Sequence, residues 1–312
     1  MDDHKDKLIS RKGFLSKASA GLLTFGLFPR ERFRLSDSQA ENKQAFPEYR
    51  LLGRTGIRVT PVGFGASRTM EPMLLRSTLK AGINFIDTGR AYFNGQNEVM
   101  VGKVIQGMRK ELVIQSKLKL PLREIGEPLD TDAAHDRIIH LMQSALTESL
   151  RALRTDYIDV LLFHEADSVD MINHDAVLEF FRDAKDKGQI RACGFSTHSN
   201  QVELLKAANK SNSYDVVMVP YNHKGSYTHS LSGNYHVWDQ PALEKELVKA
   251  EQNNIGIIAM KTCSSGPYAF GCESEPSYRS ALKWILNHSY INTMAVAMGN
   301  LSELNEDLWA MS

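Results

Sequence analysis

Four polar side chains stand at or just after the ends of predicted strands, and together they could move a proton to or from an oxygen. They are Asp87, Tyr92, Lys117 and His164. A carboxylate beside an ammonium keeps both groups ionised. We expect the lysine to stabilise a phenolate, which would lower the tyrosine pKa from about 10. Since an imidazole can bond the same oxygen, the set indicates protonation of a carbonyl or deprotonation of an alcohol.

The elements that must position these groups alternate regularly along the chain. Apolar, β-branched runs predict eight strands, at residues 62–65, 84–88, 112–117, 157–164, 190–196, 216–221, 255–261 and 292–298. Helical periodicity predicts eight helices, at residues 71–81, 98–108, 132–153, 174–187, 201–209, 242–253, 278–287 and 301–308. This alternation favours an α/β fold, a (β/α)8 TIM barrel.

Two further patterns support the closed barrel. Residues 51–59, turning at Thr55-Gly56, predict an N-terminal β-hairpin that plugs the barrel at the N-terminal end of its strands. An open doubly wound sheet is disfavoured, because Gly63-Phe64-Gly65-Ala66 after the first strand lacks the third glycine of G-x-G-x-x-G. In a barrel the chemistry lies where the C-terminal strand ends converge, so the four polar groups should meet there.

Composition excludes several other classes of protein. The chain has 312 residues, a length compatible with a single barrel domain. Its Lys and Arg residues number 37, as do its Asp and Glu residues, so the formal net charge is zero. This neutrality argues against a nucleic-acid binder. Three cysteines cannot form a disulfide framework, and no apolar run reaches the roughly 18 residues of a membrane span.

The sequence around the four polar residues resembles the aldo-keto reductase family. The matching motifs run in family order between Tyr49 and Leu308: GINFIDTGRAY at 82–92 with Asn97-Glu98 and Gly102, VIQSK at 113–117, SLRAL at 149–153, TDYIDVLLFH at 155–164, GQIR at 188–191 and GFSTHS at 194–199. The segment GIIAMK at 256–261 is most similar to bacterial members of the family.

The resemblance implies an activity and roles for the four residues. The activity is reduction of a small-molecule aldehyde or ketone to an alcohol, or the reverse, by hydride transfer with NADH or NADPH. Tyr92 would be the general acid/base, with Lys117 and Asp87 tuning it and His164 orienting the carbonyl.

The same resemblance implies where the nicotinamide end of the cofactor would bind. Ser196 and Thr197 would hold the carboxamide, with Met218 where a glutamine is common. Met260 stands where many members stack a tyrosine on the ring, and a thioether can also pack against a ring face.

The phosphate contacts are expected from backbone N–H groups. They would come from Ser264, Ser265 and Gly266, and from the helix start near Gly299-Asn300. Because the chain ends at Ser312, soon after the last predicted helix, we expect an open substrate pocket.

The residues expected near the adenosine part of the cofactor indicate whether NADH or NADPH is preferred. Counting back from Glu306-Asp307, the resemblance places Ala297, Met298 and Glu303 where NADPH-preferring members carry cations or polar groups. No cation remains for a 2′-phosphate, and Glu303 could accept a hydrogen bond from a free ribose hydroxyl. We therefore expect NADH to be favoured; the alternative is that Glu303 is only a solvated helix residue.

The first 34 residues differ from the rest of the chain. Basic residues precede an apolar stretch at 18–28, and SRKGFLSK at 10–17 resembles a twin-arginine signal with Lys12 as the second basic residue. Residues 35–48 would be a linker and 49–312 the barrel. A used signal would place the protein in the periplasm or cell envelope, and otherwise it would be cytoplasmic; the alternative is a disordered basic tail.

Two rival functions remain open. One is a metal-dependent barrel hydrolase using Asp87, His164, His198 and His223, although no H-x-H or H-E-x-x-H spacing occurs and we expect no metal. The other is a non-catalytic nucleotide-binding sensor. The departures in the carboxamide pocket favour the sensor, and the complete set of four catalytic-type residues argues against it.

Overall fold

The computed structural model describes residues 48–121, 125, 128–229, 232–263 and 277–311, all within the unit Ala45–Ser312. The predicted signal segment, nearly all of the predicted linker, and Ser264, Ser265 and Gly266 lie outside the described residues. The domain boundaries proposed from the sequence therefore stay a prediction.

Eight parallel strands close into a barrel in the order β11-β12-β3-β4-β5-β6-β7-β8. Their bounds are β3 Val62–Gly65, β4 Phe85–Asp87, β5 Val113–Leu118, β6 Ile158–Phe163, β7 Ile190–Ser196, β8 Val216–Pro220, β11 Gly256–Met260 and β12 Thr293–Ala297. Each strand lies within one residue of its predicted ends. The predicted (β/α)8 barrel is confirmed.

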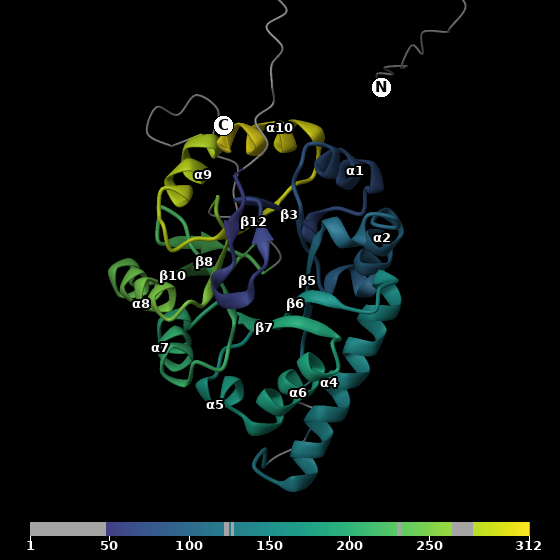
Figure 1. Cartoon of the computed structure of the whole chain (residues 1–312). Helices are drawn as coiled ribbons and strands as arrows, with labels where there is room; N and C mark the ends of the chain where they lie inside the picture. The colour runs from purple at the N-terminus through teal and green to yellow at the C-terminus, as the bar shows by residue number, and fades with distance from the viewer. Residues whose placement is uncertain (1–47, 122–124, 126–127, 230–231, 264–276, 312) are drawn as a thin grey trace, which may run out of the picture. The chain divides into compact units, whose positions relative to one another are not determined.

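Helices surround the strands (Figure 1). They are α1 Pro72–Lys80, α2 Gln96–Val104, α4 Asp132–Leu153, α5 Val169–Ile172, α6 Asp175–Asp186, α7 Gln201–Ser211, α8 Gln240–Gln252, α9 Tyr278–Leu286 and α10 Leu301–Ala310. Within the described ranges, no helix is both long and apolar enough to cross a bilayer. The short helix α5 and a second hairpin, β9 Ser226–Thr228 with β10 Tyr235–Val237, were not predicted.

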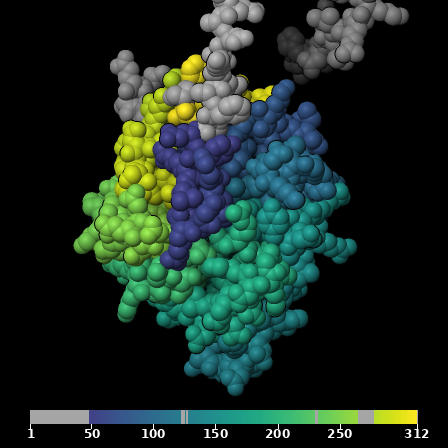
Figure 2. Space-filling model, viewed as in Figure 1, coloured from purple at the N-terminus to yellow at the C-terminus, as the bar shows by residue number. Residues whose placement is uncertain are grey.

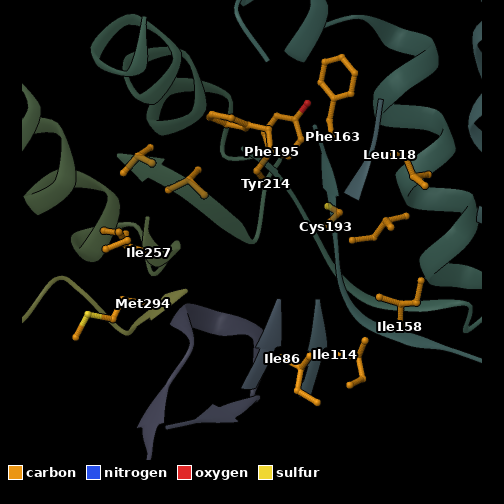
Figure 3. Close-up of a cluster of buried hydrophobic side chains, with 14 of the residues drawn as sticks. Ile86, Ile114, Leu118, Ile158, Phe163, Cys193, Phe195, Tyr214, Ile257 and Met294 are labelled. Atoms are coloured by element: carbon orange, nitrogen blue, oxygen red, sulfur yellow. The ribbon is translucent and has the colours of Figure 1, made fainter. Parts of the chain in front are cut away.

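The barrel strands alternate between two apolar clusters. Outward-facing side chains such as Ile86, Ile114 and Phe195 pack beneath the helices (Figure 3). Inward-facing side chains such as Phe85 and Val113 fill the barrel interior. Because the side-chain period of a strand is two, this alternation also sets which polar residues face inward at the strand ends.

The N-terminal hairpin closes one end of the barrel, as predicted. Strands β1 (Arg50–Leu51) and β2 (Arg58–Val59) pair antiparallel, and Leu52 between them belongs to the interior cluster. The N–H of Arg54 donates to the carbonyl of Asn254, which precedes β11, at 2.7 Å. The hairpin residues fill the centre of the face seen in Figure 2. The C-terminal ends of the strands, at the opposite end of the barrel, are not covered by this hairpin.

Candidate active site

A cavity of about 700 Å³ lies at the C-terminal ends of the barrel strands. Its lining residues come from loops and ends of most strands, and they are Gly65, Ser67, Arg68, Asp87, Ala91, Tyr92, Phe93, His164, Glu165, His198, Met218, His229, Met260, Lys261, Thr262, Cys263, Ala295 and Ala297. Three of the four predicted catalytic residues line it, and the fourth, Lys117, is bonded to two of them.

The Lys117 ammonium is the centre of the predicted set. It is buried and forms an ion pair with Asp87. It also donates to the hydroxyl of Tyr92 at 3.0 Å and to the carbonyl of Thr88 at 2.8 Å. Burial opposes the charge on Lys117, but the Asp87 carboxylate and the bond to Tyr92 outweigh it and raise the lysine pKa. Lys117 is therefore a permanent cation against the phenol.

A short irregular loop brings Tyr92 back over the barrel mouth. The N–H of Tyr92 donates to the carbonyl of Gly89 at 2.9 Å, and a 3-10 turn follows at Tyr92–Gly95. Phe93 and Asn94 in this turn have positive φ angles of 49° and 51°, a region that non-glycine residues seldom occupy. Such backbone conformations persist only where surrounding contacts hold them.

Buried polar bonds hold this loop against the barrel. The carboxylate of Glu98 accepts from Arg90 at 2.7 Å and from the hydroxyl of Ser116 on β5 at 2.6 Å. The hydroxyl of Thr88 donates to the side chain of Asn97 at 2.7 Å. The Asn97-Glu98 motif thus fixes the loop that carries Tyr92.

The expected effect of Lys117 on the phenol is outweighed in the structure. Burial raises the pKa of Tyr92, Lys117 opposes this, and the Asp87 carboxylate adds to the rise, so the pKa lies above its ordinary value of 10.0. The prediction of an unusually acidic phenol is wrong, because it considered the Lys117 cation and not the burial of the hydroxyl. Tyr92 is therefore protonated at neutral pH and equipped to donate a proton.

His164 lies on the other side of the same opening. Its ring meets the ring of Tyr92 edge-on with centroids 6.0 Å apart. Burial and the nearby Lys117 cation lower the pKa of His164 to about 3, so the imidazole is neutral at pH 7. Its Nδ1 atom is buried and has no hydrogen-bond partner among the described residues. A neutral imidazole can direct one N–H group at a substrate oxygen.

The sequence interpretation missed one member of this polar cluster. Gln115 precedes Lys117 by two residues on β5 and faces the same way. Its amide donates to the Asp87 carboxylate at 2.6 Å and contacts the sulfur of Met218 at 3.4 Å. The period of two along a strand that already carried Lys117 was the signal that could have found it.

The predicted carboxamide residues divide into two groups. Met218 and Met260 line the cavity, where their thioethers can face a bound ring. Ser196 is buried and its hydroxyl accepts from the N–H of Glu165 at 3.3 Å. The Thr197 hydroxyl donates to the carbonyl of Ser199 and accepts from its N–H, so it is engaged in a local turn.

The start of α10 carries the predicted adenosine residues. The side chain of Asn300 caps the helix by accepting from the N–H of Glu303 at 3.0 Å. In return the Glu303 carboxylate accepts from the N–H of Gly299 at 2.6 Å and from the Asn300 amide at 3.0 Å. This arrangement resembles a capping box, except that the carboxylate bonds the backbone N–H of the residue before the cap, so an acidic side chain occupies an N–H group that could otherwise bind an anion. Glu306 follows on the same helix and is partly exposed.

Asp307 on α10 is buried rather than directed at solvent. One of its carboxylate oxygens has no partner among the described residues. Burial, with a smaller effect of Glu303 and Glu306, raises the pKa of Asp307 to about 8. Asp307 is therefore largely protonated at neutral pH and is unsuited to accept a hydrogen bond as a carboxylate.

One cluster of side chains at the cavity has the geometry to hold a metal ion. One ligand atom from each of His164, Glu165 and His198 lies within 4.8 Å of the others. In the part of the chain that the structure describes, this cluster includes neither Asp87, which is paired with Lys117, nor His223. The hydrolase alternative thus lacks two of its four proposed ligands at this site.

Comparisons with known proteins agree with this geometry. A model of the Aldo/keto reductase family matches residues 66–279. The chain is similar to the uncharacterized oxidoreductase YqkF of Bacillus subtilis, at 25% identity over 83% of this chain and 77% of that protein. It is 31% identical to the aldo-keto reductase YhdN of the same organism, over 56% of this chain and 54% of that protein.

A solved structure shares the fold. The holo form of an aldo-keto reductase from Bacillus halodurans superposes with a TM-score of 0.67 at 21% identity. The match covers 85% of this chain and 91% of the other.

The buried Asp307 generates a prediction for stability against pH. Because its folded pKa of about 8 exceeds the unfolded value, Asp307 favours folding fully below about pH 4 and loses that contribution as the pH rises through 8. Asp307→Asn, which cannot ionise, should leave Tm nearly unchanged at pH 4 and raise it by roughly 2–5 °C at pH 9.

Thermal unfolding followed by circular dichroism at the two pH values measures this difference. Asp156→Asn, at an exposed position, is the matched control and should show no pH-dependent gain. Equal Tm differences for Asp307→Asn at pH 4 and pH 9 would contradict the prediction.

Proposed function

Because the chain belongs to the aldo/keto reductase family, we propose that Tyr92 donates the proton when it reduces a carbonyl compound. It is an oxidoreductase that reduces carbonyls with a nicotinamide cofactor, NADH or NADPH, as the family match and the oxidoreductase relatives support. The observation that carries the proposal for Tyr92 is its hydroxyl, 3.0 Å from a buried lysine and facing the cavity.

The cavity suits a nicotinamide ring and a small carbonyl compound together. Pockets of a few hundred to a thousand Å³ are usual for such ligands, and this one has about 700 Å³. Ala295 and Ala297 of β12 line it with small side chains, while Met218 and Met260 offer apolar surface. When bound, the nicotinamide cofactor supplies the hydride.

The residues of the chain perform the proton chemistry. The carbonyl oxygen lies between the hydroxyl of Tyr92 and the ring of His164, and both donate hydrogen bonds to it. As negative charge develops on that oxygen, the phenol proton moves to it. The tyrosinate that remains is stabilised by the Lys117 ammonium, whose other bonds to Asp87 and Thr88 hold it in place.

The raised pKa of Tyr92 suits the role of proton donor in the reduction. A proton donor must be protonated, and Tyr92 remains so until the pH exceeds 10.0. Oxidation of an alcohol needs the phenolate as base, which burial and Asp87 disfavour.

We also propose that NADH is preferred over NADPH. The capping carboxylate of Glu303 would face a 2′-phosphate at the start of α10, and Ala297 and Met298 supply no cation there. The capping role also gives Glu303 a structural purpose, so the preference would arise from repulsion of phosphate rather than from a ribose contact.

The cellular location remains a proposal from the sequence. We propose that residues 1–34 are a twin-arginine signal and that the barrel begins at Tyr49 after a linker. Since this route exports folded proteins, the cofactor would be loaded before export to the periplasm or cell envelope. Recovery of the full-length protein only from the cytosolic fraction would refute the signal.

Removal of the phenol hydroxyl tests the proposed proton donor. Tyr92→Phe should lower kcat/KM for aldehyde reduction by about 10²–10⁴-fold, because general acid catalysis is lost. The wild-type value should stay flat from pH 6 to 9, since Tyr92 titrates above its ordinary value. Steady-state assays with a panel of carbonyl compounds measure both quantities.

Tyr235→Phe, in the exposed part of the β9–β10 hairpin, is the matched control and should retain activity. Turnover by Tyr92→Phe equal to that of the wild type would refute the role of Tyr92. A wild type that binds cofactor but turns over no carbonyl would support the sensor alternative instead.

Charge removal at Glu303 tests the cofactor preference. Glu303→Gln keeps groups that can cap the helix, so it should tighten NADPH binding about threefold to tenfold and change NADH binding little. Quenching of protein fluorescence by each cofactor measures both dissociation constants. Tenfold tighter binding of NADPH than of NADH by the wild-type protein would contradict the proposed preference.

A further inference from the structure

Gln115 places a polar amide in the apolar interior of the barrel. Because side chains alternate along β5, Gln115 faces the same way as Val113, which belongs to the cluster that fills the interior. The Gln115 side chain is fully buried, and its amide nitrogen lies 3.4 Å from the sulfur of Met218 on β8. Burial of an amide costs free energy that only hydrogen bonds return. The hydrogen bonds of Gln115 therefore show what the amide contributes.

Only the nitrogen of this amide is bonded to an oxygen. It donates to Oδ1 of Asp87 at 2.6 Å, while the amide oxygen Oε1 is buried with no partner among the described residues. Because an ionised carboxylate only accepts hydrogen bonds, the amide cannot rotate to satisfy its oxygen at the same contact. An apolar side chain of similar volume would avoid the unsatisfied oxygen. The bond to Asp87 is thus what glutamine provides at this position.

Gln115 and Lys117 donate to the same oxygen of Asp87. Both bonds reach Oδ1, and the Lys117 ammonium also donates to the hydroxyl of Tyr92 at 3.0 Å. The main chain joins Gln115 and Asp87 as well, because the N–H of Thr88 donates to the Gln115 carbonyl at 2.9 Å. The carboxylate is therefore held from inside the barrel on one side and by the ammonium on the other.

The two charges beside the phenol act on it in opposite directions. Burial raises the pKa of Tyr92 most; Lys117 lowers it, and Asp87 raises it. A hydrogen bond donated to a carboxylate stabilises and disperses its negative charge. Without the amide donor, Asp87 would attract the Lys117 ammonium more strongly, and the bond from Lys117 to Tyr92 would weaken. A tyrosinate at Tyr92 would then be less stable.

We propose that Gln115 is a positioning residue, whose amide anchors Asp87 and thereby leaves the Lys117 ammonium available to stabilise the tyrosinate. The inference rests on the proposed function, in which Tyr92 donates its proton to the carbonyl oxygen. Gln115 is not among the residues that line the cavity, so it acts through Asp87 and Lys117 rather than on the substrate.

Removal of the amide tests this role in turnover. Gln115→Met keeps the side-chain volume and removes both the donor and the unsatisfied oxygen. It should lower kcat for aldehyde reduction roughly tenfold and change KM less than about threefold, because the tyrosinate forms only during proton transfer. Thr293→Val, which removes a buried hydroxyl bonded to the carbonyl of Thr60, is the matched control and should keep the wild-type kcat.

The NMR signal of the Tyr92 ring reports the same contacts without turnover. Carbon-13 labelling of the tyrosine rings, with Tyr92→Phe to assign the signal, allows the comparison at pH 7. The Tyr92 signal should shift in Gln115→Met, because the bond from Lys117 to the phenol weakens. It should not shift in Thr293→Val, where a buried hydrogen bond is lost away from this cluster.

Gln115→Glu makes the donor depend on pH. A carboxyl group buried beside a carboxylate keeps its proton above its usual pKa of about 4.3. When protonated it can donate to Asp87 as the amide does, and when ionised it repels Asp87. The charged groups that face this position are Asp87 on β4 and Lys117 on β5, whereas Val160 on β6 and Met218 on β8 are uncharged.

The pH profile of Gln115→Glu is therefore diagnostic. Its kcat should lie within about threefold of the wild-type value at pH 6 and fall at least roughly tenfold by pH 9, while the wild type stays flat. The Tyr92 signal of this variant should shift over the same pH range. A structural role for Gln115 would instead lower kcat equally at every pH and leave the Tyr92 signal unchanged.

An unchanged Tyr92 signal in Gln115→Met, or the absence of a pH-dependent shift in Gln115→Glu, overturns the proposal. Either result would overturn it even if kcat fell, since Gln115 would then only support the packing. Failure of the proposed function is a different outcome. A wild type that reduces no carbonyl compound would refute the function, and the Tyr92 signal would still decide whether Gln115 arranges the charges around the phenol.

Discussion

The contact of one buried ammonium with a carboxylate and a phenol is the interaction on which the site depends. Lys117 is an interior residue of β5, Asp87 ends the adjacent strand β4, and Tyr92 returns to them through the following loop. The parallel register pairs Asp87 with Gln115, two residues before Lys117, so the lysine side chain reaches past the strand end. A shift of this register by one residue would turn Lys117 toward the helices. The register of β4 against β5 is thus a requirement of the site.

The sequence was sufficient for the fold, and it singled out the four polar residues that the structure brings together at the cavity, while their catalytic roles stay a proposal. Strand and helix periods predicted the barrel, and the resemblance to aldo-keto reductases identified Asp87, Tyr92, Lys117 and His164. The direction of the Tyr92 pKa could not be predicted, because burial is a property of all the side chains around the hydroxyl. The sign of that shift changes the interpretation from a poised phenolate to a protonated acid.

The sequence also could not predict which charged side chains form ion pairs with one another. Lys119 and Lys261 look alike in the chain, yet Lys119 pairs with Glu165 whereas Lys261 has no carboxylate partner among the described residues. Likewise, the sequence predicted that Glu303 bonds a ribose hydroxyl, or else is a solvated helix residue, and only its bonds to Gly299 and Asn300 identify it as a cap. Both carboxylates that line the cavity are thus in ion pairs with lysines that the sequence alone could not assign to them.

The most direct test of this account is the titration of Tyr92 itself in the ligand-free protein. Carbon-13 labelling of the tyrosine ring, with Tyr92→Phe to assign the signal, follows the phenol by NMR as the pH is raised. The account predicts that the Tyr92 signal keeps its protonated position beyond pH 10.0, since burial and Asp87 outweigh Lys117. Titration of that signal near neutral pH would contradict the account, because Tyr92 would then be partly ionised and able to act as a base.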